Sequence, residues 1–211
     1  MFPKSIRRVS LSGQVWGIIP DTETDSFFLE VRDEKVKTCG IWKVDLLKDD
    51  LEELELNFDW WSKLIGADNN QLYFVAYNDL NDPTKQSFFS IGLLSGEKEE
   101  IEQIPEIETF FNHPNIYEYG TEYFKTVADF LSLELPLSCE YLEWNNKIII
   151  SYYLRSDNGF DRFLLLLRDG KKEWKIQQDS QMKGFAPGSF FVHNDQIIFI
   201  KDRNEVCVYA E

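Results

Sequence analysis

The sequence predicts an all-β fold built from repeated four-stranded antiparallel sheets, and two observations lead to this prediction. The first is the stretch of residues 139–178, in which short turns join four strand-like segments: CEYLEW, KIIISYYLRS, RFLLLLR and EWKIQQ. The second is that the same pattern recurs elsewhere in the chain of 211 residues. Aromatic residues make up 15% of the chain and are mostly phenylalanine, which also favours strands.

Each repeat is recognised by a tight turn that is followed by an apolar strand. The four turns are Thr24-Asp25, Asn69-Asn70, Asn145-Asn146 and Asn194-Asp195. Asn and Asp tolerate the positive φ angles of a two-residue hairpin turn, and the apolar runs fit strands buried on both faces. The repeat length is about 45 residues, which is typical of β-propeller blades, and only the middle interval is longer, by about 30 residues.

The later strands of each repeat follow in order. Third strands are predicted at residues 40–44, 87–91, 162–166 and 205–209, and fourth strands at 51–56, 98–104 and 173–177. The last repeat ends without a fourth strand, whereas residues 4–10 read as a strand with no other role. We therefore expect the N-terminal strand to complete the last sheet, which closes the ring and removes an open sheet edge.

Residues 105–138 break the pattern. Pro105 and Pro114 interrupt the segment, and apolar residues then recur every three to four positions after Thr121, which predicts one short helix near residues 121–133. The segment either caps four blades or replaces part of a degenerate fifth. We expect one propeller-like domain over residues 1–211, with an irregular and helical insert at 105–138 and repeats at about 11–57, 58–104, 139–179 and 186–211 together with 2–10.

Charge and composition restrict the partners and the location. The formal net charge of −15 repels phosphate backbones and anionic lipids, so neither nucleic acid nor a membrane surface is expected as a partner. The partner is therefore expected to be an unknown protein or a small molecule. The three cysteines are far apart and predict buried thiols rather than disulfides or a zinc site. Without a signal-type leader or an 18-residue apolar run, a cytoplasmic location is expected.

No catalytic residue, metal site or cofactor is predicted. The two histidines, His113 and His193, stand in turn-like contexts without a nucleophile motif, and no phosphate-binding loop occurs. The segment 157–161, DNGFD, has the oxygen-rich character of a calcium loop but lacks the other ligands, so a plain loop is preferred. Carboxylates are plentiful, which keeps paired-acid chemistry open.

One group of polar residues is a candidate ligand site. The second strand of each repeat ends in a polar group with an aspartate, and in a propeller these ends open on one face. The candidates are Arg32, Asp33, Asn78, Asp79, Arg155, Asp157 and Asp202, with Trp60 and Trp61 beside them. Converging Arg, Asp and Trp side chains are typical of binding sites. The alternative is that Arg and Asp pair with each other and that the tryptophans pack between sheets.

Several segments carry a resemblance to known repeats. Residues 164–174 and 89–101 are similar to the third and fourth strands of quinoprotein-type propeller repeats. The chain as a whole resembles a bacterial domain-of-unknown-function family of propeller-like proteins, through VWGIIPDTET (15–24), EVRDE (30–34), DWW (59–61), YNDLNDP (77–83) and YLEWNNKIIISYYL (141–154). The resemblance implies the fold and assigns no activity.

Two functions are therefore compatible with the sequence. The first is a non-enzymatic binding or scaffolding module that uses one rim of the propeller. The alternative is a small carboxylate-based hydrolase or lyase, with or without a divalent metal.

Overall fold

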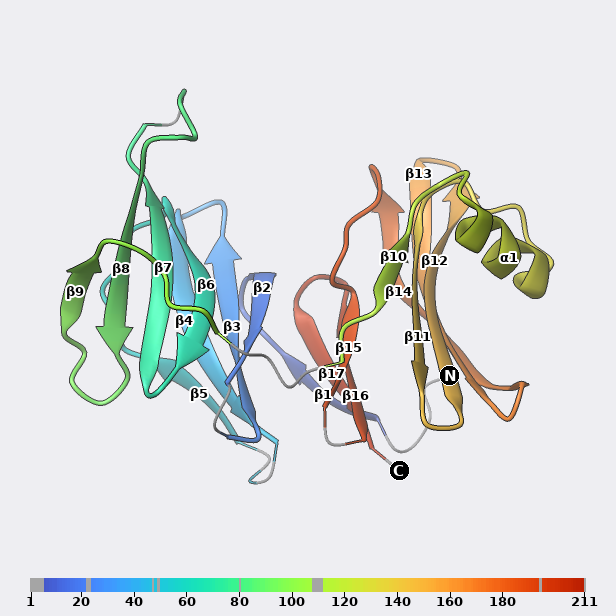
Figure 1. Ribbon diagram of the computed structural model, residues 1–211, viewed down its shortest axis with the longest axis horizontal. Coiled ribbons are helices and arrows are strands. Elements are labelled where there is room, and N and C mark those ends of the chain that lie inside the picture. Colours follow the sequence, from blue (N-terminus) through green and yellow to red (C-terminus); the bar gives the residue numbers. More distant parts are fainter. Residues whose placement is uncertain are drawn as a thin grey trace. The chain divides into compact units, whose positions relative to one another are not determined.

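The computed structural model describes residues 6–21, 24–46, 48, 50–79, 81–107, 112–193 and 195–210. These residues form four antiparallel sheets and one α-helix, as the sequence predicts (Figure 1). The chain divides into two compact units. The first unit is Leu11–Phe110, and the second unit combines Met1–Ser10 with Phe111–Glu211. Whether both belong to one domain stays a prediction.

The first unit contains two sheets. The first sheet has the order β2-β3-β4-β5, with strands Gln14–Pro20, Ser26–Asp33, Thr38–Asp45 and Asp50–Leu54. The second sheet has the order β6-β7-β8-β9, with strands Ser62–Asp68, Gln71–Tyr77, Gln86–Gly92 and Lys98–Ile101. Phe28 and Ile41 of the first sheet share a core with Phe74 and Phe89 of the second. The rings of Phe74 and Phe89 stack at 5.0 Å.

The second unit contains the other two sheets. The third sheet has the order β10-β11-β12-β13-β14, with strands Asn115–Tyr117, Cys139–Trp144, Lys147–Ser156, Gly159–Arg168 and Lys171–Met182. The fourth has the order β1-β17-β16-β15, with strands Ile6–Ser10, Glu205–Tyr209, Gln196–Lys201 and Phe190–His193. Trp174 of the third sheet packs against Phe199 and Tyr209 of the fourth, with ring centroids 6.2 and 5.3 Å away.

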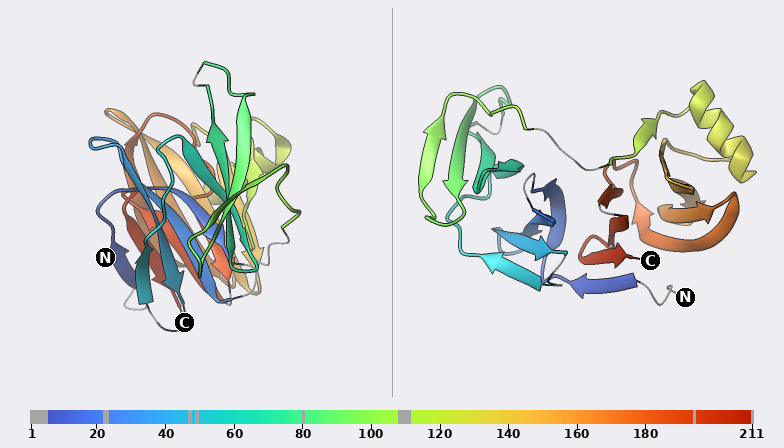
Figure 2. Two further views of the ribbon diagram at one scale, coloured as in Figure 1. Left: turned by 90° about the vertical axis from the view of Figure 1, so that its left-hand side faces the viewer. Right: turned by 60° about the horizontal axis from the view of Figure 1, so that its bottom comes forward.

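The N-terminal strand completes the last sheet, as predicted. β1 pairs antiparallel with β17, with Ile6 opposite Tyr209 and Ser10 opposite Glu205 (Figure 2). The first two residues of the predicted strand, Lys4 and Ser5, lie outside the described residues. The pairing gives β17 a partner on its second edge, which would otherwise present unpaired backbone groups.

The tight turns follow the predicted chemistry in all but the first repeat. Asn69 and Asn70 have φ angles of 50° and 61°, and Asn145 has 54°, the positive values that two-residue hairpins require. In the last repeat Asp195 is at 61°, while Asn194 lies outside the described residues. The prediction of a two-residue turn at Thr24-Asp25 is wrong, because β2 already ends at Pro20, β3 begins at Ser26, and the Asp21 amide donates a hydrogen bond to the Ser26 carbonyl oxygen.

The insert contains the predicted helix and one strand that was not predicted. Helix α1 spans Glu122–Leu131, and the side chain of Thr121 caps it by accepting a hydrogen bond from the Phe124 amide. Phe124 and Val127 belong to a core cluster with residues of the third sheet, and α1 lies beside that sheet (Figure 1). Because β10 pairs with β11, the third sheet has five strands rather than four, and the insert is less irregular than expected. In the described part of the chain, no helix has the length and apolar character needed to cross a membrane.

Candidate functional site

The predicted site residues lie at the strand ends where the sequence places them, but in two separate compact units. Arg32 and Asp33 end β3, Asn78 and Asp79 follow β7, and Trp60 and Trp61 precede β6 in the first unit, while Arg155, Asp157 and Asp202 belong to the second. Among these residues, the structure brings Arg32 and Trp60 into contact. The environment of each one decides what it can do.

Arg32 is the centre of a buried polar network. It is only 5% exposed, and its Nε donates a hydrogen bond to Glu30 Oε1 at 2.5 Å. Its two terminal nitrogens donate to the carbonyl oxygens of Trp60, at 2.6 Å, and Ser62, at 2.5 Å. Glu30 is fully buried, and its other oxygen accepts a hydrogen bond from the Leu64 amide at 2.9 Å. The pair therefore ties the first sheet to the chain entering the second.

Tryptophan side chains surround this arginine. The guanidinium carbon lies 4.7 Å from the centroid of Trp16 and 5.1 Å from that of Trp60, and the two indoles meet edge to face at 6.0 Å. Trp16 and Trp61 are each 50% exposed. We call Trp16, Trp60 and Trp61 the tryptophan surface. Cation–π contacts with Arg32 and Lys37 and the hydrogen bond from Arg32 to its carbonyl oxygen hold Trp60 in place, so this part of the surface is preorganised.

Asp33 has a different role from Arg32, although the two are neighbours in sequence. Its Oδ1 accepts hydrogen bonds from the amides of Lys35 and Val36, so it shapes the β3–β4 turn. It also lines a polar pocket of about 130 Å³, together with Cys39 and other residues of the first unit. Burial raises the pKa of the Cys39 thiol, which makes it a poor nucleophile at neutral pH.

Asn78 and Asp79 belong to a loop whose polar groups satisfy each other. Asp79 accepts hydrogen bonds from the Lys85 ammonium and the Asn81 amide, both at 3.0 Å. The hydrogen bond from Lys85, followed by that from Asn81, lowers the pKa of Asp79. The Asn78 side-chain oxygen accepts a hydrogen bond from the Ser87 hydroxyl at 3.4 Å. These contacts give the loop its shape.

The candidates of the second unit lie at exposed strand ends. Arg155 is exposed, and its guanidinium carbon lies 5.7 Å from the Phe160 ring. Asp157 belongs to the two-residue turn between β12 and β13, so the calcium-like segment is a tight hairpin. Asp202 forms an ion pair with Lys201. No group of three or more potential metal-binding side chains was found within the described ranges.

A second buried network, which the sequence analysis missed, lies in the second unit. Glu140 is 1% exposed and accepts hydrogen bonds from the amides of Gly188 at 2.6 Å and Ser189 at 3.2 Å. Buried Arg162 forms an ion pair with Asp179 and donates to the carbonyl oxygen of Ala186 at 3.2 Å. Desolvation raises the pKa of Glu140, although the hydrogen bonds and Arg162 oppose this effect.

The two networks share one design. Leu64 and Ser189 each lie five residues before the tight turn of their repeat, and each donates its amide to a buried glutamate of the preceding sheet. An arginine of that preceding sheet then binds a carbonyl in the same entry segment. The signal that could have revealed the networks is the presence of charged residues inside apolar strands, such as Glu30 and Arg162.

Comparisons with known proteins add only distant structural likenesses. No family model matches the sequence, and no curated protein does either. An acylaminoacyl peptidase of Pyrococcus horikoshii is similar at 11% identity over 91% of this chain and 36% of its own, with a TM-score of 0.27. A subtype N11 neuraminidase-like protein of A/flat-faced bat/Peru/033/2010 (H18N11) is similar at 7% identity over 90% of this chain and 47% of its own, with a TM-score of 0.26.

The chain thus spans between about a third and a half of the length of these proteins. TM-scores this low do not indicate a shared fold or a shared function.

Proposed function

We propose that the protein is a non-enzymatic binding module and that the tryptophan surface binds its ligand. The observation that carries the proposal is that Trp16, which packs on Arg32 and Trp60, is half exposed, as is Trp61, the next residue after Trp60. Tryptophan is enriched among the side chains that dominate binding energy, and burying an exposed indole against a ligand is favourable.

The contacts assign different roles to the residues of this surface. Each of the three guanidinium nitrogens of Arg32 already donates a hydrogen bond within the protein, so we assign Arg32 to positioning Trp60 rather than to contacting ligand. Trp16 and Trp61 supply apolar faces. Lys37, whose Nζ lies 4.7 Å from the centroid of Trp60, supplies a hydrogen-bond donor. A neutral ligand with one apolar face, such as a sugar, suits these groups and the net charge of −15.

We further propose that the four sheets are blades of one β-propeller. The support is the repeat of about 45 residues and the strand exchange at the N-terminus, where β1 completes the last sheet and the chain then enters β2 of the first. Small-angle X-ray scattering distinguishes this arrangement from two tethered bodies. A single compact particle with one maximum in its distance distribution is expected, and two maxima would contradict the propeller.

Ligand binding is tested by thermal shift and tryptophan fluorescence with a panel of neutral mono- and disaccharides. We expect at least one sugar to raise Tm in the wild type and in the control Leu94→Ala, which removes an exposed apolar side chain elsewhere in the first unit. Trp16→Ala and Trp61→Ala should each abolish the shift. Trp61→Ala should leave the Tm of the free protein unchanged, whereas Trp16→Ala also removes contacts with Arg32 and Trp60 and should lower it. A shift that persists in both variants, or no shift at all, would refute the proposal.

The same thermal-shift assay also tests the alternative function, a carboxylate-based hydrolase or lyase. Calcium, magnesium and EDTA are added to the wild type without sugar. The binding module is expected to keep its Tm in all three, whereas a metal-dependent shift would favour the carboxylate-based hydrolase or lyase.

A further inference from the structure

Exposed apolar side chains of the second unit gather around helix α1. In the part of this unit that the structure describes, the exposed large apolar residues are Val9, Ile116, Tyr119, Tyr123 and Phe130. Four of these five therefore lie in one short segment that contains β10 and most of α1. Single exposed apolar residues are common, but a contiguous group of them marks an interaction site.

Helix geometry explains why two of these rings face solvent. Phe124 and Val127 point to the third sheet and are buried there. Tyr123 and Phe130 lie seven residues apart, which is two helical turns, so they share one side of α1 about 10 Å apart. They are 70% and 51% exposed. Their rings therefore contribute little to the core.

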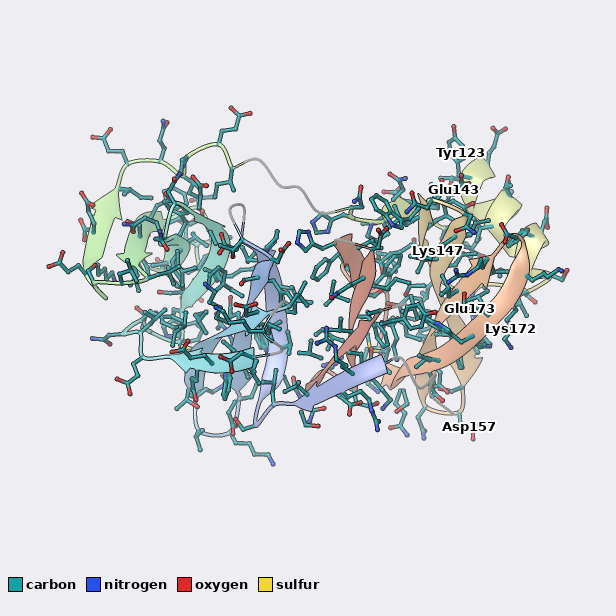
Figure 3. All side chains as sticks on the ribbon, turned by 90° about the horizontal axis from the view of Figure 1, so that it is seen from below. Tyr123, Glu143, Lys147, Asp157, Lys172 and Glu173 are labelled. Atoms are coloured by element: carbon teal, nitrogen blue, oxygen red, sulfur yellow. The ribbon has the colours of Figure 1, made fainter. Side chains whose placement is uncertain are left out.

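A row of stacked tyrosines continues this stripe across the sheet. The ring of Tyr123 lies 5.4 Å from Tyr117 on β10, and Tyr117 lies 5.5 Å from Tyr141 on β11, with interplanar angles of 26° and 20°. The Tyr141 hydroxyl donates a hydrogen bond to Glu143 Oε1 at 2.6 Å. Figure 3 shows Tyr123 and Glu143 on the same side of the unit. Three different elements thus hold the row in place.

We define the tyrosine surface as this row together with the neighbouring exposed rings: Tyr117, Tyr119, Tyr123, Phe130 and Tyr141. Tyr119 joins the group because its ring lies 5.2 Å from Phe124 at the start of α1.

The charges around the tyrosine surface are almost all negative. Between residues 115 and 143 the exposed carboxylates are Glu118, Glu122, Asp129, Glu134 and Glu143, and the exposed lysine is Lys125. A second copy of the chain would bring the same carboxylates and a net charge of −15 to the contact. A cationic partner gains attraction and faster association instead.

We propose that the tyrosine surface docks a segment of another protein in which arginine or lysine alternates with apolar side chains. Arginine matches both features of the surface, because its guanidinium plane stacks on tyrosine rings and its nitrogens pair with carboxylates. The apolar side chains of the segment cover the exposed face of Phe130. This surface is separate from the tryptophan surface, which belongs to the first unit.

The experiment uses the full chain and a fluorescein-labelled 12-residue peptide of alternating leucine and arginine, measured by fluorescence anisotropy. We expect binding that weakens with salt, and no binding of the same peptide with glutamate in place of arginine. Tyr123→Ala combined with Phe130→Ala should raise Kd at least tenfold, and Glu143→Gln about threefold. Two controls in the first unit, Leu94→Ala and Glu99→Gln, remove an apolar side chain that is even more exposed and a carboxylate that is likewise exposed, and should change Kd less than twofold.

Three outcomes would overturn the proposal. The first is no binding at 1 mM peptide. The second is an equal loss of affinity in the control variants, which would mean that the peptide binds through net charge alone. The third is self-association of the wild type in sedimentation that Tyr123→Ala removes, since a second copy would then cover the surface. Circular dichroism of each variant confirms that its fold is intact.

Discussion

Replacing Arg32 by alanine is the sharpest test of the buried network in the first unit. The change leaves the Glu30 carboxylate buried without its cation and leaves two carbonyl groups, of Trp60 and Ser62, without their donors. Each hydrogen bond to a charged group contributes about 1.5–3 kcal/mol, and part of this offsets the desolvation of the pair. Removing one partner of a buried ion pair costs about 3–5 kcal/mol, which we expect for Arg32→Ala.

Urea unfolding followed by tryptophan fluorescence measures this effect, because Trp16 and Trp60 contact the guanidinium and report on its surroundings. Arg155→Ala is the matched control. Arg155 is exposed, so the free energy of unfolding should change by less than about 0.5 kcal/mol. The loss of unfolding free energy in Arg32→Lys should lie between those of Arg32→Ala and Arg155→Ala, since lysine keeps the charge but loses the forked geometry of the guanidinium group.

A double variant, Glu30→Leu with Arg32→Met, removes both charges together. Because no buried charge is left unpaired, it should be clearly more stable than Arg32→Ala alone. The reasoning fails if Arg32→Ala costs less than about 1 kcal/mol, or if Arg155→Ala destabilises the protein as much.

Three further predictions concern the second unit. Deleting residues 1–10 removes β1 and exposes the edge of β17, so light scattering should show aggregation; an unchanged monomer with the same Tm would contradict this role. Trp174→Ala should cost about 3–5 kcal/mol in urea unfolding, because the buried ring packs on the fourth sheet; a loss below about 1 kcal/mol would exclude this packing. Burial raises the pKa of Glu140, so its contribution to stability decreases as pH rises from its unfolded value, about 4.3, through the higher native value. Glu140→Gln should therefore show a flatter stability profile than the wild type over that pH range, and parallel profiles would argue against a raised pKa.

Much of the fold follows from local sequence patterns. The alternation of apolar residues and the Asn and Asp turns set the strands, and the missing strand of the last repeat predicted its pairing with the N-terminus. These features depend on residues close together in the chain or on a simple count of strands. β10 could not be predicted from the local pattern, because it has only three residues and is a strand only through its pairing with β11.

The candidate site depended much more on tertiary contacts. The repeat pattern predicted the same role for Arg32 and Arg155, because each lies near the end of the second strand of its repeat. β12 has ten residues and β3 has eight, so Arg155 extends to an exposed end, while Arg32 is covered by the entry segment of the next sheet. Trp16 was not among the predicted site residues, and only its packing on Arg32 places it there.

The sequence by itself therefore determined every strand except β10, the order of the predicted strands within each sheet and the closure of the last sheet, because turn chemistry and strand periodicity act locally along the chain. Only the tertiary structure decided which charged residues are buried, because the groups that satisfy them are backbone amides and carbonyls of a neighbouring sheet. Glu30 and Glu140 illustrate this, since their partners at Leu64 and Ser189 lie more than thirty residues away and show no sign of the contact in their side chains.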